Sequence, residues 1–128
     1  MFDLYVTTQK EEIKSKVYSL LCDVKDKRFV DFLVSALSKP KYSGIKKEVT
    51  GISWQTGLDF SGKLSVFVDL LINGTDEVAI EAYSVFESSV DYITKEEKSN
   101  VKLLLSKDAG SLSDFRKGLI AETVYLFE

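Results

Sequence analysis

The sequence predicts an all-α fold of six to seven helices, stacked as antiparallel helix pairs. Three observations lead to this prediction. Apolar residues recur at spacings of three and four over most of the 128 residues. The only proline, Pro40, and most of the seven glycines fall between these apolar-periodic segments. Two segments open with a threonine followed three residues later by glutamate, which is a helix-capping box.

The first helix is expected over residues 8–24, where Thr8 and Glu11 form the first capping box. The first pair is expected over residues 29–57. Its first helix ends before Pro40, which cannot continue a helix, and a break is expected at residues 39–43. Its second helix is expected from the spacing of Ile45, Val49 and Ile52, although Gly51 and the β-branched residues have a low helix propensity.

The second pair is expected over residues 60–93. Valine and phenylalanine in "FSGKLSVFVDLLING" are also typical of a strand, but their spacing fits a helix that stops at Asn73-Gly74. Thr75 and Asp76 are the cap candidates of the partner helix. The third pair is expected over residues 95–128. It begins with the Thr94 box, breaks at Gly110 and resumes with Ser111 or Ser113 as cap.

Three apolar segments recur with a constant offset. "LVSALS" begins at Leu33, "FVDLLI" at Phe67 and "VKLLLS" at Val101, so the offsets are 67 − 33 = 34 and 101 − 67 = 34. Each is followed by an amphipathic partner segment. A period of 34 residues suits an α-solenoid of stacked helix pairs, with the N-terminal helix as a cap. We therefore expect residues 1–128 to form a single α-helical domain.

The middle unit resembles a HEAT-type repeat, whose second helix commonly opens with an aspartate and a valine before small apolar positions. Here these are Asp76, Val78, Ala82 and Val85. The resemblance covers residues 60–90 well and the flanking pairs loosely. It implies a HEAT-like α-solenoid scaffold that binds other macromolecules and has no chemistry of its own.

The composition excludes several function classes. The chain has no histidine, one cysteine and no glycine-rich phosphate loop, so we expect no catalytic, cofactor-binding or metal-binding residues and no enzyme activity. Only two of its 17 basic residues are arginine, against 20 acidic residues, which argues against nucleic acid as a partner. No segment is long and apolar enough to span a membrane. We expect a cytoplasmic monomer.

An acidic stretch is the candidate binding site. Glu77, Glu81 and Asp91 recur with serines at helical spacing, Glu87 flanks them, and no lysine or arginine lies between Lys63 and Lys95. A solvated helix face explains one such stripe, whereas a whole interval without positive charge favours a basic partner. Within or beside this interval lie two further acidic residues, Asp59 and Asp69.

Most phenylalanines, among them Phe32 and Phe115, are in phase with apolar faces and are expected in the core. Two other aromatic residues complete the candidate binding set. Trp54 ends an already apolar helix face, so it either packs on the next repeat or contacts a partner. Tyr83 suits the rim of an interface.

In size, charge and absence of catalytic motifs the chain resembles the small acidic immunity proteins of bacterial contact-dependent growth inhibition systems. The resemblance implies a non-catalytic toxin inhibitor that blocks a basic nuclease toxin domain by protein–protein interaction. The alternative is a HEAT-like adaptor or phage accessory module that binds a peptide or helix of a protein partner. A neighbouring toxin gene would distinguish the two.

Overall fold

The computed structural model describes residues 10–106 and 112–128, and in them it confirms the all-α prediction. Seven α-helices and one short 3-10 helix make up the described elements, without a strand among them. In chain order they are α2 (Glu11–Cys22), α3 (Arg28–Leu37), η1 (Pro40–Ile45), α4 (Lys46–Gln55), α5 (Leu64–Asn73), α6 (Asp76–Ser89), α7 (Lys95–Ser106) and α8 (Asp114–Leu126). They group into two compact units, one ending at Leu58 and one starting at Asp59. The single domain and the solenoid stay predictions.

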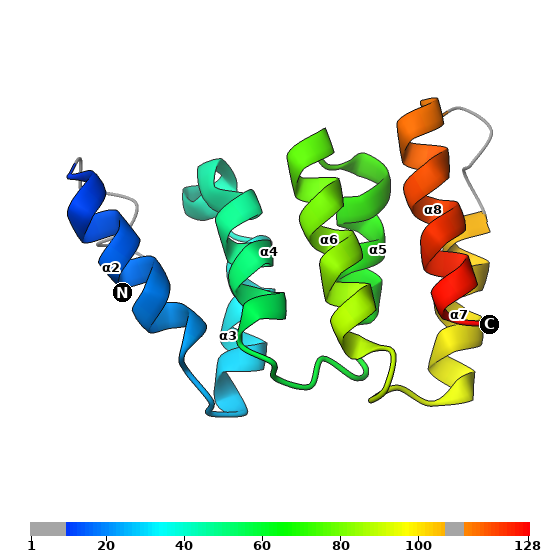
Figure 1. Ribbon diagram of the computed structural model, residues 1–128, viewed down its shortest axis with the longest axis horizontal. Coiled ribbons are helices and arrows are strands. Elements are labelled where there is room, and N and C mark those ends of the chain that lie inside the picture. The colour runs from blue at the N-terminus through cyan, green and yellow to red at the C-terminus, as the bar shows by residue number, and fades with distance from the viewer. Residues whose placement is uncertain (1–9, 107–111) are drawn as a thin grey trace. The chain divides into compact units, whose positions relative to one another are not determined.

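In the first unit α4 packs against both α2 and α3, and η1 lies beside α3 and α4 (Figure 1). The expected break at residues 39–43 is a turn of 3-10 helix with Pro40 in its first turn, where the missing N–H of proline costs nothing. Small residues of α4 are buried, and the Ser53 hydroxyl donates to the Val49 carbonyl at 2.9 Å. Small side chains allow neighbouring helices to approach α4 closely.

The first helix differs from its prediction. It begins at Glu11 behind Lys10, which supplies no side-chain cap, and it ends at Cys22. The proposed cap at Thr8 lies outside the described residues. Of the expected apolar face only Val17 and Leu21 are buried, whereas Leu20 is half exposed. Its far end is held to α4 by Gln55, whose Nε2 donates to the Tyr18 hydroxyl at 2.7 Å.

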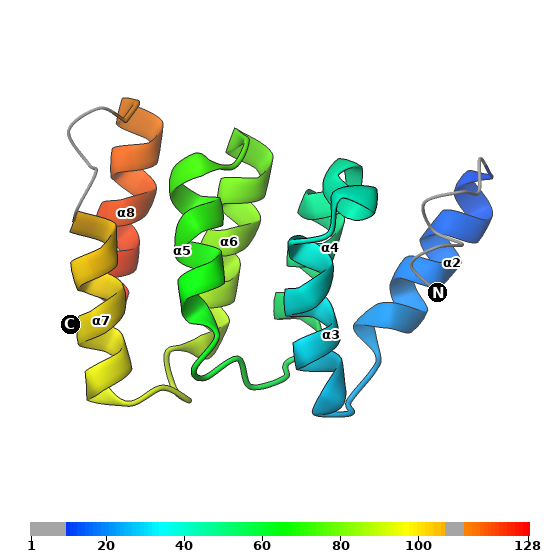
Figure 2. The same cartoon turned by 180° about the vertical axis from the view of Figure 1, so that it is seen from behind.

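The second unit consists of two helix pairs in two layers. Figure 1 looks onto α6 and α8, and Figure 2 looks from behind onto α5 and α7. Each helix contacts its own partner and its counterpart in the other pair, so α5 packs on α7 and α6 packs on α8. Three fully buried phenylalanines, Phe60, Phe67 and Phe86, belong to the core of this unit. This arrangement leaves one side of α6 and one side of α8 facing solvent.

Three of the four helix starts in the second unit use a cap candidate from the sequence, whereas α5 begins behind Lys63 without a side-chain cap. The Thr75 hydroxyl accepts a hydrogen bond from the Val78 N–H, and Ser113 does the same for Arg116. Thr94 accepts from the Glu97 N–H at 3.1 Å. Each hydroxyl satisfies one of the backbone donors that a helix start leaves without a partner.

The 34-residue offset coincides with a pattern of burial. Leu33, Phe67 and Val101 are all buried. One turn later, Leu37, Leu71 and Leu105 are buried as well. The first helices of the three pairs therefore use equivalent positions to face the interior of their units.

Arg116, on α8, binds the backbone carbonyls at the end of α5, a contact that we call the clasp. This side chain is almost fully buried, and its guanidinium donates to the carbonyls of Leu71 at 3.2 Å, Ile72 at 2.9 Å and Gly74. It also contacts an Asp76 carboxylate oxygen at 3.1 Å. The last carbonyls of a helix lack partners within the helix, and they carry its negative dipole end. One cation therefore satisfies the end of α5 and reaches the start of α6.

Gly74 ends α5, as predicted, but not through a left-handed conformation. Its φ is −73°, which any residue adopts. A Cβ atom at Gly74 would lie 2.6 Å from the Leu70 carbonyl oxygen and 2.9 Å from a Val78 methyl. The tight turn between α5 and α6 therefore requires glycine for space.

We predict that Arg116→Met lowers the free energy of unfolding by about 2 to 4 kcal/mol, because it leaves buried carbonyls without their charged donor. Urea denaturation followed by helical circular dichroism measures this. Lys117→Met is the matched control, since Lys117 is the exposed neighbour on the same helix. Equal effects of the two substitutions would show that the clasp does not stabilise the fold.

Two glycine-to-alanine substitutions are predicted to act in opposite directions. Gly74→Ala destabilises by about 1 to 3 kcal/mol, because its Cβ collides with backbone. Gly118→Ala, in the middle of α8, stabilises by about 0.5 to 1 kcal/mol, because a Cβ there meets no atom within 4 Å and alanine is the better helix former. Thermal unfolding of both variants tests the pair. Destabilisation by Gly118→Ala would contradict the open space seen at that site.

Candidate functional site

The candidate site starts from α6, whose first turn carries Asp76 and Glu77. The Thr75 cap and the positive dipole end of the helix favour both carboxylates at this place. Glu87 is exposed near the other end of the helix, and Glu81 is half buried. The outer side of α6 is therefore acidic over its whole length.

The structure divides the predicted acidic stripe. Asp76 contacts Arg116 of α8, and positions seven and eleven residues later, Tyr83 and Glu87, lie on the same side of α6. Glu77 and Glu81 lie on the side of α6 that points away from α8. Asp91 is not on the helix at all, because α6 ends at Ser89 and Asp91 lies in the exposed turn that follows.

Two other predicted acidic residues do not join α6. Asp59 lies in the segment before α5, where its carboxylate accepts from the Ser61 N–H at 2.8 Å and from the Ser61 hydroxyl. Asp69 lies on the exposed side of α5, in the other layer, and accepts from the Asn73 side chain at 2.8 Å. Both carboxylates have local roles in holding their own segments.

The two predicted aromatic residues have different surroundings. Trp54 lies at the end of α4 in the first unit, with 36% of its surface exposed. Tyr83 is half buried on α6. Burial raises the pKa of the Tyr83 hydroxyl, and the nearby carboxylates of Glu87 and Glu122 raise it further. Tyr83 therefore marks a place where acidic residues of two helices come together.

Glu122 was missed by sequence reasoning. It is exposed on α8, far from the acidic stretch in the chain. Only the stacking of α6 on α8 brings it within electrostatic reach of Tyr83. The signal that could have identified it is the predicted solenoid, in which the second helices of consecutive pairs are neighbours.

Several large apolar side chains accompany the carboxylates. Ile80 on α6 is 46% exposed, and on α8 Phe115 is 43% and Tyr125 is 75% exposed. The prediction that Phe115 belongs to the core is therefore wrong, and the same holds for Phe32, which is 44% exposed. Phe32 instead stacks on Phe29, with their ring centroids 5.8 Å apart.

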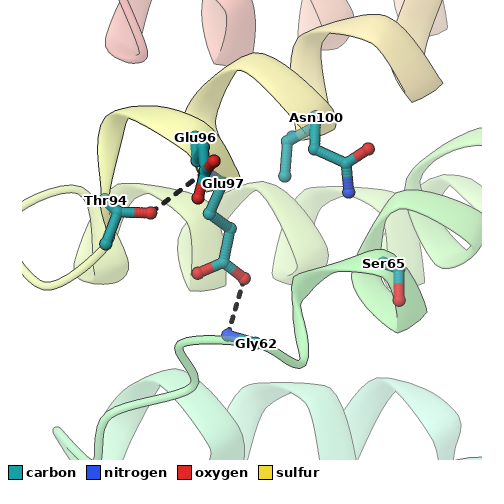
Figure 3. A pocket seen from close by; sticks show the side chains of 7 residues that line it. Gly62, Ser65, Thr94, Glu96, Glu97 and Asn100 are labelled. Carbon is teal, nitrogen blue, oxygen red and sulfur yellow. Dashed lines mark hydrogen bonds between the residues drawn. The ribbon is translucent and has the colours of Figure 1, made fainter.

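A separate hollow of about 470 Å³ lies at the start of α7. Figure 3 shows that Ser65 from α5 and Asn100 from α7 flank it. The Glu97 carboxylate accepts from the Gly62 N–H at 2.6 Å, where Gly62 has a φ of +82° that favours glycine. Half of the predicted capping box is therefore formed. Thr94 caps α7, whereas Glu97 binds the segment that precedes α5.

No group of three or more cysteine, aspartate or glutamate side chains suited to a metal ion occurs in residues 10–106 and 112–128. Burial raises the pKa of the Cys22 thiol, and the charge of Asp23 adds to this, so the thiol stays protonated at neutral pH. Within the described ranges, no helix combines the length and apolar character needed to cross a bilayer.

Comparisons with protein-family models, with curated proteins and with solved structures find no match to this chain.

We predict that Tyr83 titrates above the ordinary tyrosine pKa in the folded chain. Because this raised pKa favours the neutral hydroxyl, the unfolded chain loses its proton first, and Tyr83 lowers stability as pH rises above about 10. Ultraviolet difference titration against Tyr83→Phe isolates this tyrosine. In Glu87→Gln/Glu122→Gln the pKa falls only part of the way, since burial is the larger cause. An unchanged pKa in the double variant would show that the two carboxylates do not act on Tyr83.

Proposed function

We propose that this chain is a non-catalytic cytoplasmic protein that neutralises a basic protein partner, which it binds on the outer side of α6. One observation supports the proposal above all. Five carboxylates lie on or directly after α6, within an interval that has no lysine or arginine from residue 64 to residue 94. They are Asp76, Glu77, Glu81, Glu87 and Asp91.

Clustered charge of one sign acts on a partner before contact. It raises the association rate of an oppositely charged surface, and the effect weakens as salt screens the charges. It also disfavours acidic partners. Such a surface suits a protein that must capture one basic target quickly.

The partner that fits best is a bacterial nuclease toxin domain, and the chain would then be its immunity protein. Nuclease domains bind phosphates through lysine and arginine, so an acidic helix can cover the same basic surface. The length of 128 residues, the net charge of −3 and the helical scaffold agree with this role. A contact-dependent growth inhibition system is the setting that we propose, with the chain acting as a monomer.

A HEAT-like adaptor that binds a peptide or helix is the second candidate. The exposed apolar side chains of Ile80 and Phe115 favour it, because helix-in-groove recognition relies on apolar anchors. In that case binding is less sensitive to salt than in the first candidate.

The product of the gene next to this one is the partner to test. We expect it to be toxic when expressed alone and harmless with this chain. Calorimetry at about 50 and about 300 mM salt then gives the affinity and its salt dependence. Glu77→Ala/Glu81→Ala/Asp91→Ala is expected to weaken binding by about tenfold or more.

The matched control is Glu11→Ala/Glu12→Ala/Asp23→Ala, which removes the same charge from exposed positions of the first unit. This control is expected to bind like the original chain. Equal losses of affinity in both triple variants would show that binding depends only on the net charge of the chain. Unchanged affinity in the Glu77→Ala/Glu81→Ala/Asp91→Ala variant would remove these three residues from the site.

A further inference from the structure

The side of α6 that faces α8 and the exposed side of α8 form one surface. Three neighbour relations set the register of the two helices. Arg116 contacts Asp76, Glu122 acts on Tyr83, and the rings of Phe127 and Phe86 lie 5.9 Å apart. The differences in number are 116 − 76 = 40, 122 − 83 = 39 and 127 − 86 = 41. Because this difference is nearly constant, the helices run in the same direction, as Figure 1 shows.

The register interleaves apolar and acidic side chains along this surface. Ile80 and Phe115 lie toward the start of both helices, and Tyr83 lies beside Glu122 in the middle. Glu87 follows one turn after Tyr83. Gly118 lies between Phe115 and Glu122 on α8. We call these residues together the α6–α8 surface. It consists of Ile80, Tyr83, Glu87, Phe115, Gly118 and Glu122.

The charges around the α6–α8 surface have one sign. Glu87 and Glu122 are exposed on it, and Asp76 borders it. α6 has no basic residue, and α8 has two, both outside this surface. Arg116 is buried in the clasp. Lys117 comes two residues after Phe115 and therefore lies on the nearly opposite side of α8. An occupant must therefore bring positive charge with it.

Gly118 is the second observation that points to an occupant. It sits in the interior of α8, where glycine weakens a helix. The fold itself does not need it, because its φ is not positive and a Cβ would meet nothing within 4 Å. A glycine that the fold does not require leaves a strip of helix backbone that no side chain covers. Another helix can approach such a strip more closely than one covered by side chains.

We propose that the α6–α8 surface docks a basic amphipathic helix of the partner. Apolar side chains of that helix rest against Ile80 and Phe115 and cross α8 at Gly118. Its lysine or arginine residues lie beside Glu87 and Glu122, where charge-assisted hydrogen bonds form. This inference rests on the proposed function and narrows it, because it assigns part of the contact to α8, which the acidic stretch in the sequence does not include.

The test uses the full chain and a synthetic peptide of about 16 residues, with leucine at every third or fourth position and arginine between. A scrambled peptide of the same composition controls for charge. Nuclear magnetic resonance titration is expected to shift the amide signals of Ile80, Gly118 and Glu122 most strongly. The scrambled peptide is expected to bind about tenfold more weakly, since it has no continuous apolar side.

Two pairs of variants separate shape from charge. Gly118→Gln adds bulk on the surface without changing charge, and Ala121→Gln adds similar bulk at an exposed position that lies about 100° around α8 from Glu122. Glu87→Gln/Glu122→Gln removes the charge of the surface, and Glu96→Gln/Glu128→Gln removes equal charge elsewhere in the same unit. The first member of each pair is expected to weaken peptide binding by about tenfold, and the second by less than about twofold.

Each outcome supports or overturns the inference. Equal losses within both pairs, or equal binding of the scrambled peptide, would overturn it, as would no binding at about 50 mM salt. Signal shifts restricted to Glu77 and Glu81 would also overturn it. That last result leaves the proposed function standing, because a basic ligand would still bind α6. Failure of the adjacent-gene experiment would instead remove the basic toxin as the partner while the peptide result stood.

Discussion

The contact between the Arg116 guanidinium and the end of α5 is the constraint on which the second unit depends. Only Gly74 and Thr75 separate α5 from α6, and the last carbonyls of a helix are costly to bury without partners. Arg116 satisfies three of these carbonyls and reaches Asp76. Its Nε has no hydrogen-bond partner among the described residues, so the contact also carries a desolvation cost.

This clasp also determines which side chains meet at the surface. It fixes the start of α6 against the start of α8, and from there the two helices run side by side. Tyr83 therefore lies near Glu122 as well as Glu87. The register of the binding surface that we propose therefore depends on a structural contact at its border. Gly118 and Phe115, by contrast, do not contribute to the stability of α8. Gly118 has space for a side chain but lacks one, and the ring of Phe115 is 43% exposed.

The differences between prediction and structure share a physical cause. Phe32 and Phe115 are in phase with apolar faces, but each keeps more than two fifths of its surface exposed among the described residues. Glu97 follows Thr94 at capping-box spacing, yet its carboxylate bonds the Gly62 N–H, which comes from a loop 35 residues earlier. Asp91 continues the acidic spacing beyond the end of α6. Local patterns describe one helix at a time, whereas neighbouring segments decide which partners are available.

The sequence by itself determined the helical class and the cap at Thr94, and it limited the caps of α6 and α8 to two candidates each, because these depend on side chains and backbone within one turn. It also located the acidic interval around α6. Only the tertiary structure decided that Glu122 lies near Tyr83 and that Arg116 binds the last carbonyls of α5. It also decided that Asp69 lies in the layer of α5 and α7, away from α6. These depend on contacts between segments about 40 residues apart, and the spacing of residues within a helix carries no information about which helix will lie beside it.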